Sequence, residues 1–142
     1  MLILDVNLAA VALAGFLGAV AMALTTLFFH AIRVPVVDVG RLIATKLLRY
    51  HSHGTRFGLL LHMATGVVLA LVYALVAPLF PGPAWLHGLG YGILLWLLMM
   101  LVILPLMGDG LFGRRNREAQ MIPSALVVHV VYGLVLGVGA QL

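Results

Sequence analysis

Four long apolar stretches, separated by short polar intervals, dominate the pattern of hydrophobic and polar positions along the chain. They cover residues 7–32, 58–80, 88–107 and 122–142, and none of them contains Lys, Arg, Asp or Glu. A helix needs about 20 apolar residues to cross roughly 30 Å of hydrocarbon. Because a segment in lipid must satisfy its own backbone hydrogen bonds, each stretch predicts a transmembrane α-helix. We therefore expect an all-α integral membrane four-helix bundle, formed as a single domain by residues 1–142.

The composition indicates that lipid is the solvent for most of the chain. Of its 142 residues, 64% are apolar and only 8% are charged, whereas a soluble domain keeps about a quarter of its residues charged. The chain has no cysteine, which excludes disulfides and thiolate metal sites. In a chain this apolar, the net charge of +4 indicates contact with anionic lipid headgroups and not with nucleic acid.

All eight Lys and Arg residues lie in two of the polar intervals, 33–57 and 108–121. Four spans place these two intervals on the same face of the membrane, and the positive-inside rule makes that face cytoplasmic. Both termini are then expected on the periplasmic or extracytoplasmic side of a bacterial inner membrane. The residues expected at the lipid headgroups are Arg41, Lys46, Arg49, Arg114, Arg115 and Arg117.

The first basic interval also carries apolar positions with helical spacing. Asp38 is a candidate N-cap, and the apolar positions that follow it are Val39, Leu42, Ile43 and Leu47. The basic residues fall mainly elsewhere around such a helix. This pattern predicts a short interfacial helix along the cytoplasmic headgroups; a solvated basic loop is the alternative.

The second and fourth spans share a motif. His62 is followed four residues later by Gly66, and His129 is followed four residues later by Gly133. Each of these spans also begins after a basic interval. We therefore expect two helix–loop–helix repeats, residues 7–80 and 88–142, in parallel orientation about an axis along the membrane normal. The alternative is convergence, since packed membrane helices favour small residues in general.

Small residues recur at a spacing of four along these spans, a spacing that places them on one helix face and allows close helix approach. The predicted packing positions are Gly15, Ala19 and Ala23 in the first span, Gly66, Ala70 and Ala74 in the second, and Gly133 and Gly137 in the fourth. Because His62 and His129 lie on the same faces, we expect both imidazoles to point into the bundle.

Three histidines form the candidate site. At 1.5 Å per residue, His62 and His129 lie roughly 6–11 Å below the cytoplasmic boundary, and His30 lies nearer to it. Ionisable groups inside a membrane point to function. His62 and His129 are candidate ligands of a b-type haem, and His30 is a candidate third ligand in a metal-binding version. The alternative is that each histidine only packs and donates a hydrogen bond to a neighbouring helix.

Four further motifs stand out: VPVVDVGRLI, HMATGVVLALVYALV, YGILLWLLMMLVILPLMGDGLFG and HVVYGLVLG. Together they resemble a family of small, uncharacterised four-span bacterial membrane proteins that carries only a domain-of-unknown-function label. The resemblance covers most of the chain and implies a four-span inner-membrane protein. It implies no activity, no cofactor and no catalytic residue.

The function that the sequence favours is non-catalytic. No nucleophile–base pair, carboxylate pair or metal-hydrolase motif is visible, so we predict no catalytic residue and no assured cofactor. The favoured interpretation is a structural or accessory subunit of a larger respiratory or photosynthetic membrane complex, with lipid and other subunits or a second copy as partners. One alternative is a b-type haem or quinone-linked electron-transfer protein that uses His62 and His129. A small transporter is another, although its spans lack the carboxylate that proton coupling usually requires.

Overall fold

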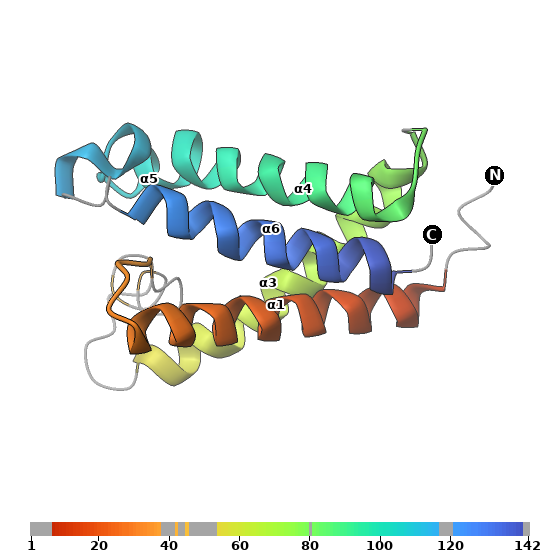
Figure 1. The fold of residues 1–142 in the computed structure, drawn as a ribbon, viewed down its shortest axis with the longest axis horizontal. Coiled ribbons are helices and arrows are strands. Elements are labelled where there is room, and N and C mark those ends of the chain that lie inside the picture. The colour runs from red at the N-terminus through yellow and green to blue at the C-terminus, as the bar shows by residue number, and fades with distance from the viewer. Residues whose placement is uncertain are drawn as a thin grey trace.

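A computed structural model shows four long helices running side by side (Figure 1). The structure describes residues 7–37, 42, 45, 54–79, 81–116 and 121–140. The helices are α1 (Leu8–Ala31), α3 (Gly54–Val76), α4 (Ala84–Leu98) and α6 (Ile122–Gly139). Taken with the short turns that extend two of them, all four are long and apolar enough to cross a membrane. The predicted all-α class with four spans is confirmed, and the chain is a multi-pass membrane protein.

Shorter elements extend the long helices. A 3₁₀ turn, η3 (Ala77–Leu79), continues α3; a π-helical turn, η4 (Met99–Ile103), and a last helical turn, α5 (Leu104–Leu106), continue α4. A further 3₁₀ segment, η5 (Leu111–Asn116), follows α5. The start of α1 and the end of α6 lie at one end of the bundle, and η5 lies at the other end with the start of α3 (Figure 1).

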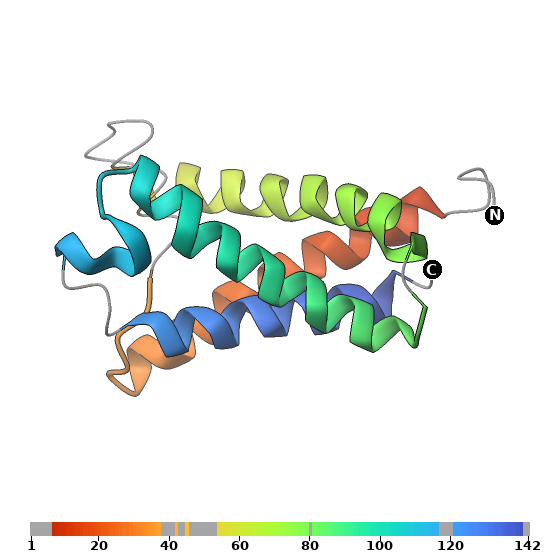
Figure 2. The same cartoon turned by 90° about the horizontal axis from the view of Figure 1, so that it is seen from above.

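The helices pack in the order α3–α1–α6–α4 (Figures 1 and 2). Helix α1 packs against α3 and α6, and α4 packs against α6. In the described part of the chain, α3 and α4 make few direct contacts, although η3 touches α4. The two outer helices, α3 and α4, therefore leave space between them over part of their length.

Small residues form the crossing between α1 and α3. Gly15 meets Gly66 and Ala70, and a methyl group on Gly15 would collide with the Cβ of Ala70. A methyl group on Gly66 would lie 2.7 Å from the Cβ of Ala19. All four residues are buried, and Ala23, at the end of the predicted stripe, is half-buried. The helices thus approach closely because these positions carry little or no side chain.

A second glycine crossing joins α4 to α6. Gly88 and Gly92 face Gly133, and Gly88 also meets Gly137. A methyl group on Gly88 or on Gly133 would collide with the backbone carbonyl of the opposite helix. This crossing and that of α1 with α3 use matching positions of the second and fourth spans, in agreement with the proposed duplication. A twofold repeat, however, would also pair α3 with α4 as it pairs α1 with α6, so the duplication stays a prediction.

A proline explains the widened turn at the end of α4. Pro105 has no N–H, and its ring crowds the carbonyl four residues earlier. In the turn just before it, the N–H of Leu104 bonds to the carbonyl of Met99, five residues back. Such π-helical turns often occur at functional sites. Here the widened turn faces the space between the outer helices.

The segment after α1 is attached to the start of α6. The hydroxyl of Ser124 donates to the carbonyl of Pro35 at 2.5 Å, and Val36 and Val37 are buried nearby. Leu42 is also buried, against residues that include Met99 and Met100. Most of the predicted interfacial helix lies outside the described residues. Its basic positions Arg41, Lys46 and Arg49 lie outside them too, as does Arg117.

Candidate functional site

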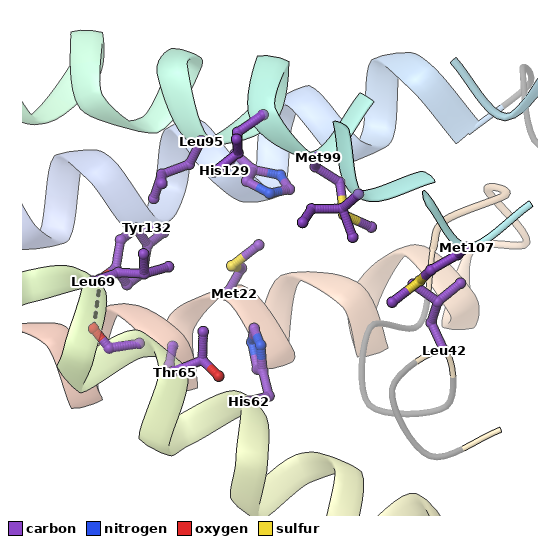
Figure 3. A pocket seen from close by; sticks show the side chains of 14 residues that line it. Met22, Leu42, His62, Thr65, Leu69, Leu95, Met99, Met107, His129 and Tyr132 are labelled. Atoms are coloured by element: carbon purple, nitrogen blue, oxygen red, sulfur yellow. Dashed lines mark hydrogen bonds between the residues drawn. The ribbon is translucent and has the colours of Figure 1, made fainter. Parts of the chain in front are cut away.

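A cavity of about 340 Å³ lies among the four helices, toward the end where the two basic intervals lie (Figure 3). Every long helix contributes to its wall, and Leu42 adds a side chain from the first interval. Most of the lining is apolar and includes three methionines, Met22, Met99 and Met107. The polar side chains in the wall are those of His62, Thr65, His129 and Tyr132.

His129 enters the cavity from α6 and is 8% exposed. Its Nδ1 lies 2.7 Å from the carbonyl oxygen of Ala125, one turn earlier on the same helix. A carbonyl oxygen only accepts, so Nδ1 carries the proton of the neutral ring and Nε2 keeps a lone pair. The imidazole points into the cavity (Figure 3). Gly92 of α4 packs directly against the backbone of His129, which holds this turn of α6 in place.

The hydroxyl groups of Thr65 and Tyr132 also donate their protons to backbone carbonyls. The hydroxyl of Thr65 donates to Leu61 of its own helix at 2.8 Å. The hydroxyl of Tyr132 donates to Gly66 of α3 at 2.6 Å, the bond drawn as a dashed line in Figure 3. Each hydroxyl oxygen still has a lone pair with which it can accept a hydrogen bond.

His62 lies on the other side of the cavity. It is half-buried on α3, and its ring points into the cavity toward the side from which His129 enters, with Met22 between them in the view (Figure 3). The structure thus brings His62 and His129 to one cavity. His30 is exposed at the end of α1 and is absent from the cavity wall. Within the described ranges, no group of three or more His, Asp or Glu residues is placed to hold a metal ion.

The cavity opens sideways between the two outer helices. Thr65 on α3 and Leu98 on α4 both line it and are both exposed. Toward the other end of the bundle, tyrosines join the outer helices: the hydroxyl of Tyr91 on α4 donates to Leu69 of α3 at 2.8 Å. The rings of Tyr73 and Tyr91 pack with their centroids 5.2 Å apart. The gap is therefore closed at the tyrosine end and open beside the histidines.

The widened turn η4 shapes one wall. Its first and last residues, Met99 and Ile103, both line the cavity. The structure thus places Met99 in the cavity wall. Pro105, six residues later, is the sequence signal of the altered turn, but a proline alone does not tell which side chains the turn directs inward.

The loop after α5 buries an acidic residue that lies just outside the third apolar stretch of the sequence. Asp109 is 0% exposed, and its carbonyl accepts the N–H of Arg115 at 2.9 Å. Gly108, Gly110 and Gly113 have positive φ, which glycine adopts without strain, so the loop folds back over the bundle end. Two of the predicted headgroup residues, Arg114 and Arg115, are exposed in η5.

Thr65 and Tyr132 were not among the predicted site residues. Each lies three residues after a histidine of the shared motif, Thr65 after His62 and Tyr132 after His129. Residues three apart share a helix face. The polar lining of the cavity was therefore visible in the sequence as a matched pair of positions. Gly88 and Gly92 were missed as well, although their spacing of four is that of a packing motif.

Comparison with known proteins adds the family and no activity. No curated protein and no solved structure matches the chain. A family model matches residues 5–142, which is nearly the whole length and includes all four helices. The predicted resemblance to an uncharacterised family is thereby confirmed. The chain belongs to the family of unknown function DUF6789.

Proposed function

We propose that this protein binds a membrane-soluble molecule in the cavity between α3 and α4. The observation that carries the proposal is the cavity itself: about 340 Å³, mostly apolar, with the polar side chains of His62, Thr65 and His129 in its wall. Ligand sites in proteins are typically apolar clefts with a few convergent polar groups that orient the ligand. The opening beside Thr65 and Leu98 gives such a molecule a path from the lipid.

Binding accounts for the geometry better than transport does. A transporter has to open its site to each side of the membrane in turn. Here the bond from Tyr91 to Leu69 joins the outer helices α4 and α3 at one end, and the bond from Tyr132 to Gly66 joins α6 to α3. The cavity instead communicates with the lipid between the helices. This supports a protein that holds or presents a lipophilic molecule.

A saturable photolabelling experiment tests the proposal. The purified protein in lipid nanodiscs is exposed to a diazirine derivative of dodecanol, and the labelled peptides are mapped by mass spectrometry. We expect labels on α3 between residues 61 and 69 and on the segment 95–107, which runs from the end of α4 through η4 and α5, and we expect excess dodecanol to suppress them. Labels spread evenly over the exposed apolar surface, without saturation, would overturn the proposal.

Two matched substitutions on α4 sharpen this test. Leu98 and Leu94 are both exposed and lie one turn apart, but only Leu98 lines the cavity. Leu98→Trp places a larger side chain at the opening and should reduce saturable labelling several-fold. Leu94→Trp adds the same bulk to the lipid-facing surface and should leave the labelling unchanged. Equal effects of the two substitutions would contradict the cavity as the binding site.

A role as an accessory subunit of a larger respiratory or photosynthetic membrane complex is the second candidate. The observation that favours it is the position of α3, which packs along one long helix, α1, and presents most of its length outward. Co-purification after gentle solubilisation tests this role. A stoichiometric partner protein that cross-links to α3 would support it, and a protein that always runs alone would contradict it.

A b-type haem in this site is a third candidate, and it needs two imidazole ligands. His129 would supply the lone pair on Nε2, which the bond from Nδ1 to Ala125 leaves available, and His62 would supply the second ligand from the opposite wall. Oxidised and reduced visible spectra of the purified protein test it. An α-band that is lost in both His62→Ala and His129→Ala would support haem ligation, and a colourless preparation would contradict it.

We also propose the orientation in the membrane. The described basic residues Arg33, Arg56, Arg114 and Arg115 all belong to the two intervals at one end of the bundle. The positive-inside rule makes this end cytoplasmic and assigns the protein to a membrane that faces the cytoplasm. The ligand cavity then lies in the half of the bundle nearer to the cytoplasm.

A further inference from the structure

We propose that the cavity prefers a neutral aromatic molecule whose head group donates hydrogen bonds, that is, a lipophilic phenol or quinol. This inference rests on the proposed binding function and specifies its ligand class. It starts from the hydrogen atoms of the polar wall. His129, Thr65 and Tyr132 each donate their proton to a backbone carbonyl, those of Ala125, Leu61 and Gly66 respectively.

What these three groups retain for a ligand are lone pairs. Three atoms can accept a hydrogen bond from a ligand: Nε2 of His129 and the hydroxyl oxygens of Thr65 and Tyr132. None of them has a further proton to donate to that ligand. A ligand that offers only acceptors, such as a quinone or an ether, leaves its oxygens unsatisfied against this part of the wall. Unsatisfied polar groups in an apolar site weaken binding. A ligand with an O–H group can donate to Nε2 of His129, which satisfies the donor of the ligand and the acceptor of the imidazole.

The apolar lining favours a ring at the head of the ligand. Met22, Met99 and Met107 contribute thioether groups to the wall, and methionine sulfur makes favourable contacts with aromatic rings. Met22 lies between the two imidazoles in the view of Figure 3, so its sulfur can contact a ring that binds beside them. The mostly apolar wall also disfavours a charged head group, because an ion loses its hydration there. These contacts together select a neutral phenol over an alkyl alcohol or a carboxylate.

Competition between two matched probes tests the preference. Decyl-hydroquinone and its dimethyl ether have the same ring and tail, but only the hydroquinone has O–H donors. Both are titrated under anaerobic conditions against photolabelling by the diazirine derivative of dodecanol, with the wild-type protein in nanodiscs. We expect the hydroquinone to suppress labelling at about a tenfold lower concentration, the effect expected for one buried hydrogen bond.

Three variants assign the preference to the wall. His129→Phe removes the acceptor, and the two probes should then compete about equally. Thr65→Val replaces an exposed hydroxyl with a methyl group of similar size, so this variant should fold as the wild type does. It should reduce the preference for the hydroquinone over its dimethyl ether about threefold. His30→Phe removes an imidazole outside the cavity and should leave the tenfold preference intact.

The outcomes separate this inference from the function on which it rests. If the dimethyl ether competes as well as the hydroquinone in the wild-type protein, the donor preference is wrong while the cavity still binds. If neither probe competes although the dodecanol label is saturable, the aromatic preference is wrong as well. If photolabelling of the cavity residues on α3 and on the segment 95–107 is not saturable, the proposed binding function itself is wrong.

Discussion

The hydroxyl of Tyr132 on α6 lies 2.6 Å from the carbonyl oxygen of Gly66 on α3, and the bond is buried. The tyrosine ring reaches this position because Gly18 of α1 has no side chain; a methyl group there would lie 2.9 Å from the ring. Gly66 in turn meets Ala19 of α1. Three helices are thus joined at one point, beside the cavity that Tyr132 and Gly66 both line.

Removing this hydroxyl should loosen α3. We expect Tyr132→Phe to lower the free energy of unfolding by about 0.6 kcal/mol and by no more than about 1.7 kcal/mol, the average and the maximum for hydrogen bonds between membrane helices. Unfolding by dodecyl sulfate in mixed micelles measures it. Tyr73→Phe is the matched control, because its bond to Ala84 is long at 3.4 Å and should contribute less. If Tyr73→Phe lowers the free energy of unfolding as much as Tyr132→Phe or more, the larger contribution expected of the Tyr132 bond is contradicted.

The glycine crossing of α4 and α6 predicts a sharp contrast between two neighbouring glycines. Gly88→Ala places a methyl group against the backbone of Gly133 and Gly137, and should destabilise the protein by about 1–3 kcal/mol through overpacking. Gly90→Ala adds the same methyl group where no atom lies within 4 Å, and should change stability by less than about 0.5 kcal/mol. Thermal unfolding of the two variants in one detergent compares them. Similar melting temperatures would refute the crossing.

The bond from Ser124 to Pro35 predicts a local effect. Ser124→Ala removes the 2.5 Å hydrogen bond and should reduce stability by about 1 kcal/mol. Hydrogen exchange should rise at Val36 and Val37, which are buried beside this bond. Thr25→Ala is the control, since its hydroxyl bonds only within α1, to Ala21 at 2.8 Å. Unchanged exchange at the two valines in Ser124→Ala would show that this bond does not hold the segment.

The proposed orientation can be tested with single cysteines, because the chain has none. Arg56→Cys and Arg114→Cys lie in the two basic intervals, and Pro81→Cys lies in the interval between α3 and α4; all three positions are exposed. A membrane-impermeant maleimide applied from the non-cytoplasmic side should label only Pro81→Cys. Arg56→Cys and Arg114→Cys should react only after the membrane is permeabilised. Labelling of these two from opposite sides would contradict four spans.

The four spans followed from length and hydropathy, since lipid imposes both on any helix that crosses it. Helix α4 extends beyond its apolar stretch. The stretch begins at residue 88, whereas the helix begins at Ala84. Trp85 lies in this first turn, and an aromatic residue at a membrane interface can lie inside a helix as well as before it. Hydropathy therefore locates the apolar part of the helix and not its first turn.

The inward direction of His62 and His129 also followed from the sequence, because each shares a face with small residues. The order in which the helices pack did not follow from the sequence, because different helix orders can bury the same small residues. The burial of Asp109 was missed for a related reason. Its position after the third span says nothing about the loop, in which Phe112 also adopts a positive φ of 54° to reach Trp96.

In the binding function proposed above, the sideways opening beside Thr65 and Leu98 decides what controls occupancy. A molecule that enters from the lipid never has to dissolve in water, so its supply depends on its mole fraction among the membrane lipids. Release returns it to the same lipid layer. A change in membrane composition would therefore fill or empty the protein at constant aqueous conditions, which would make occupancy a measure of what the membrane contains.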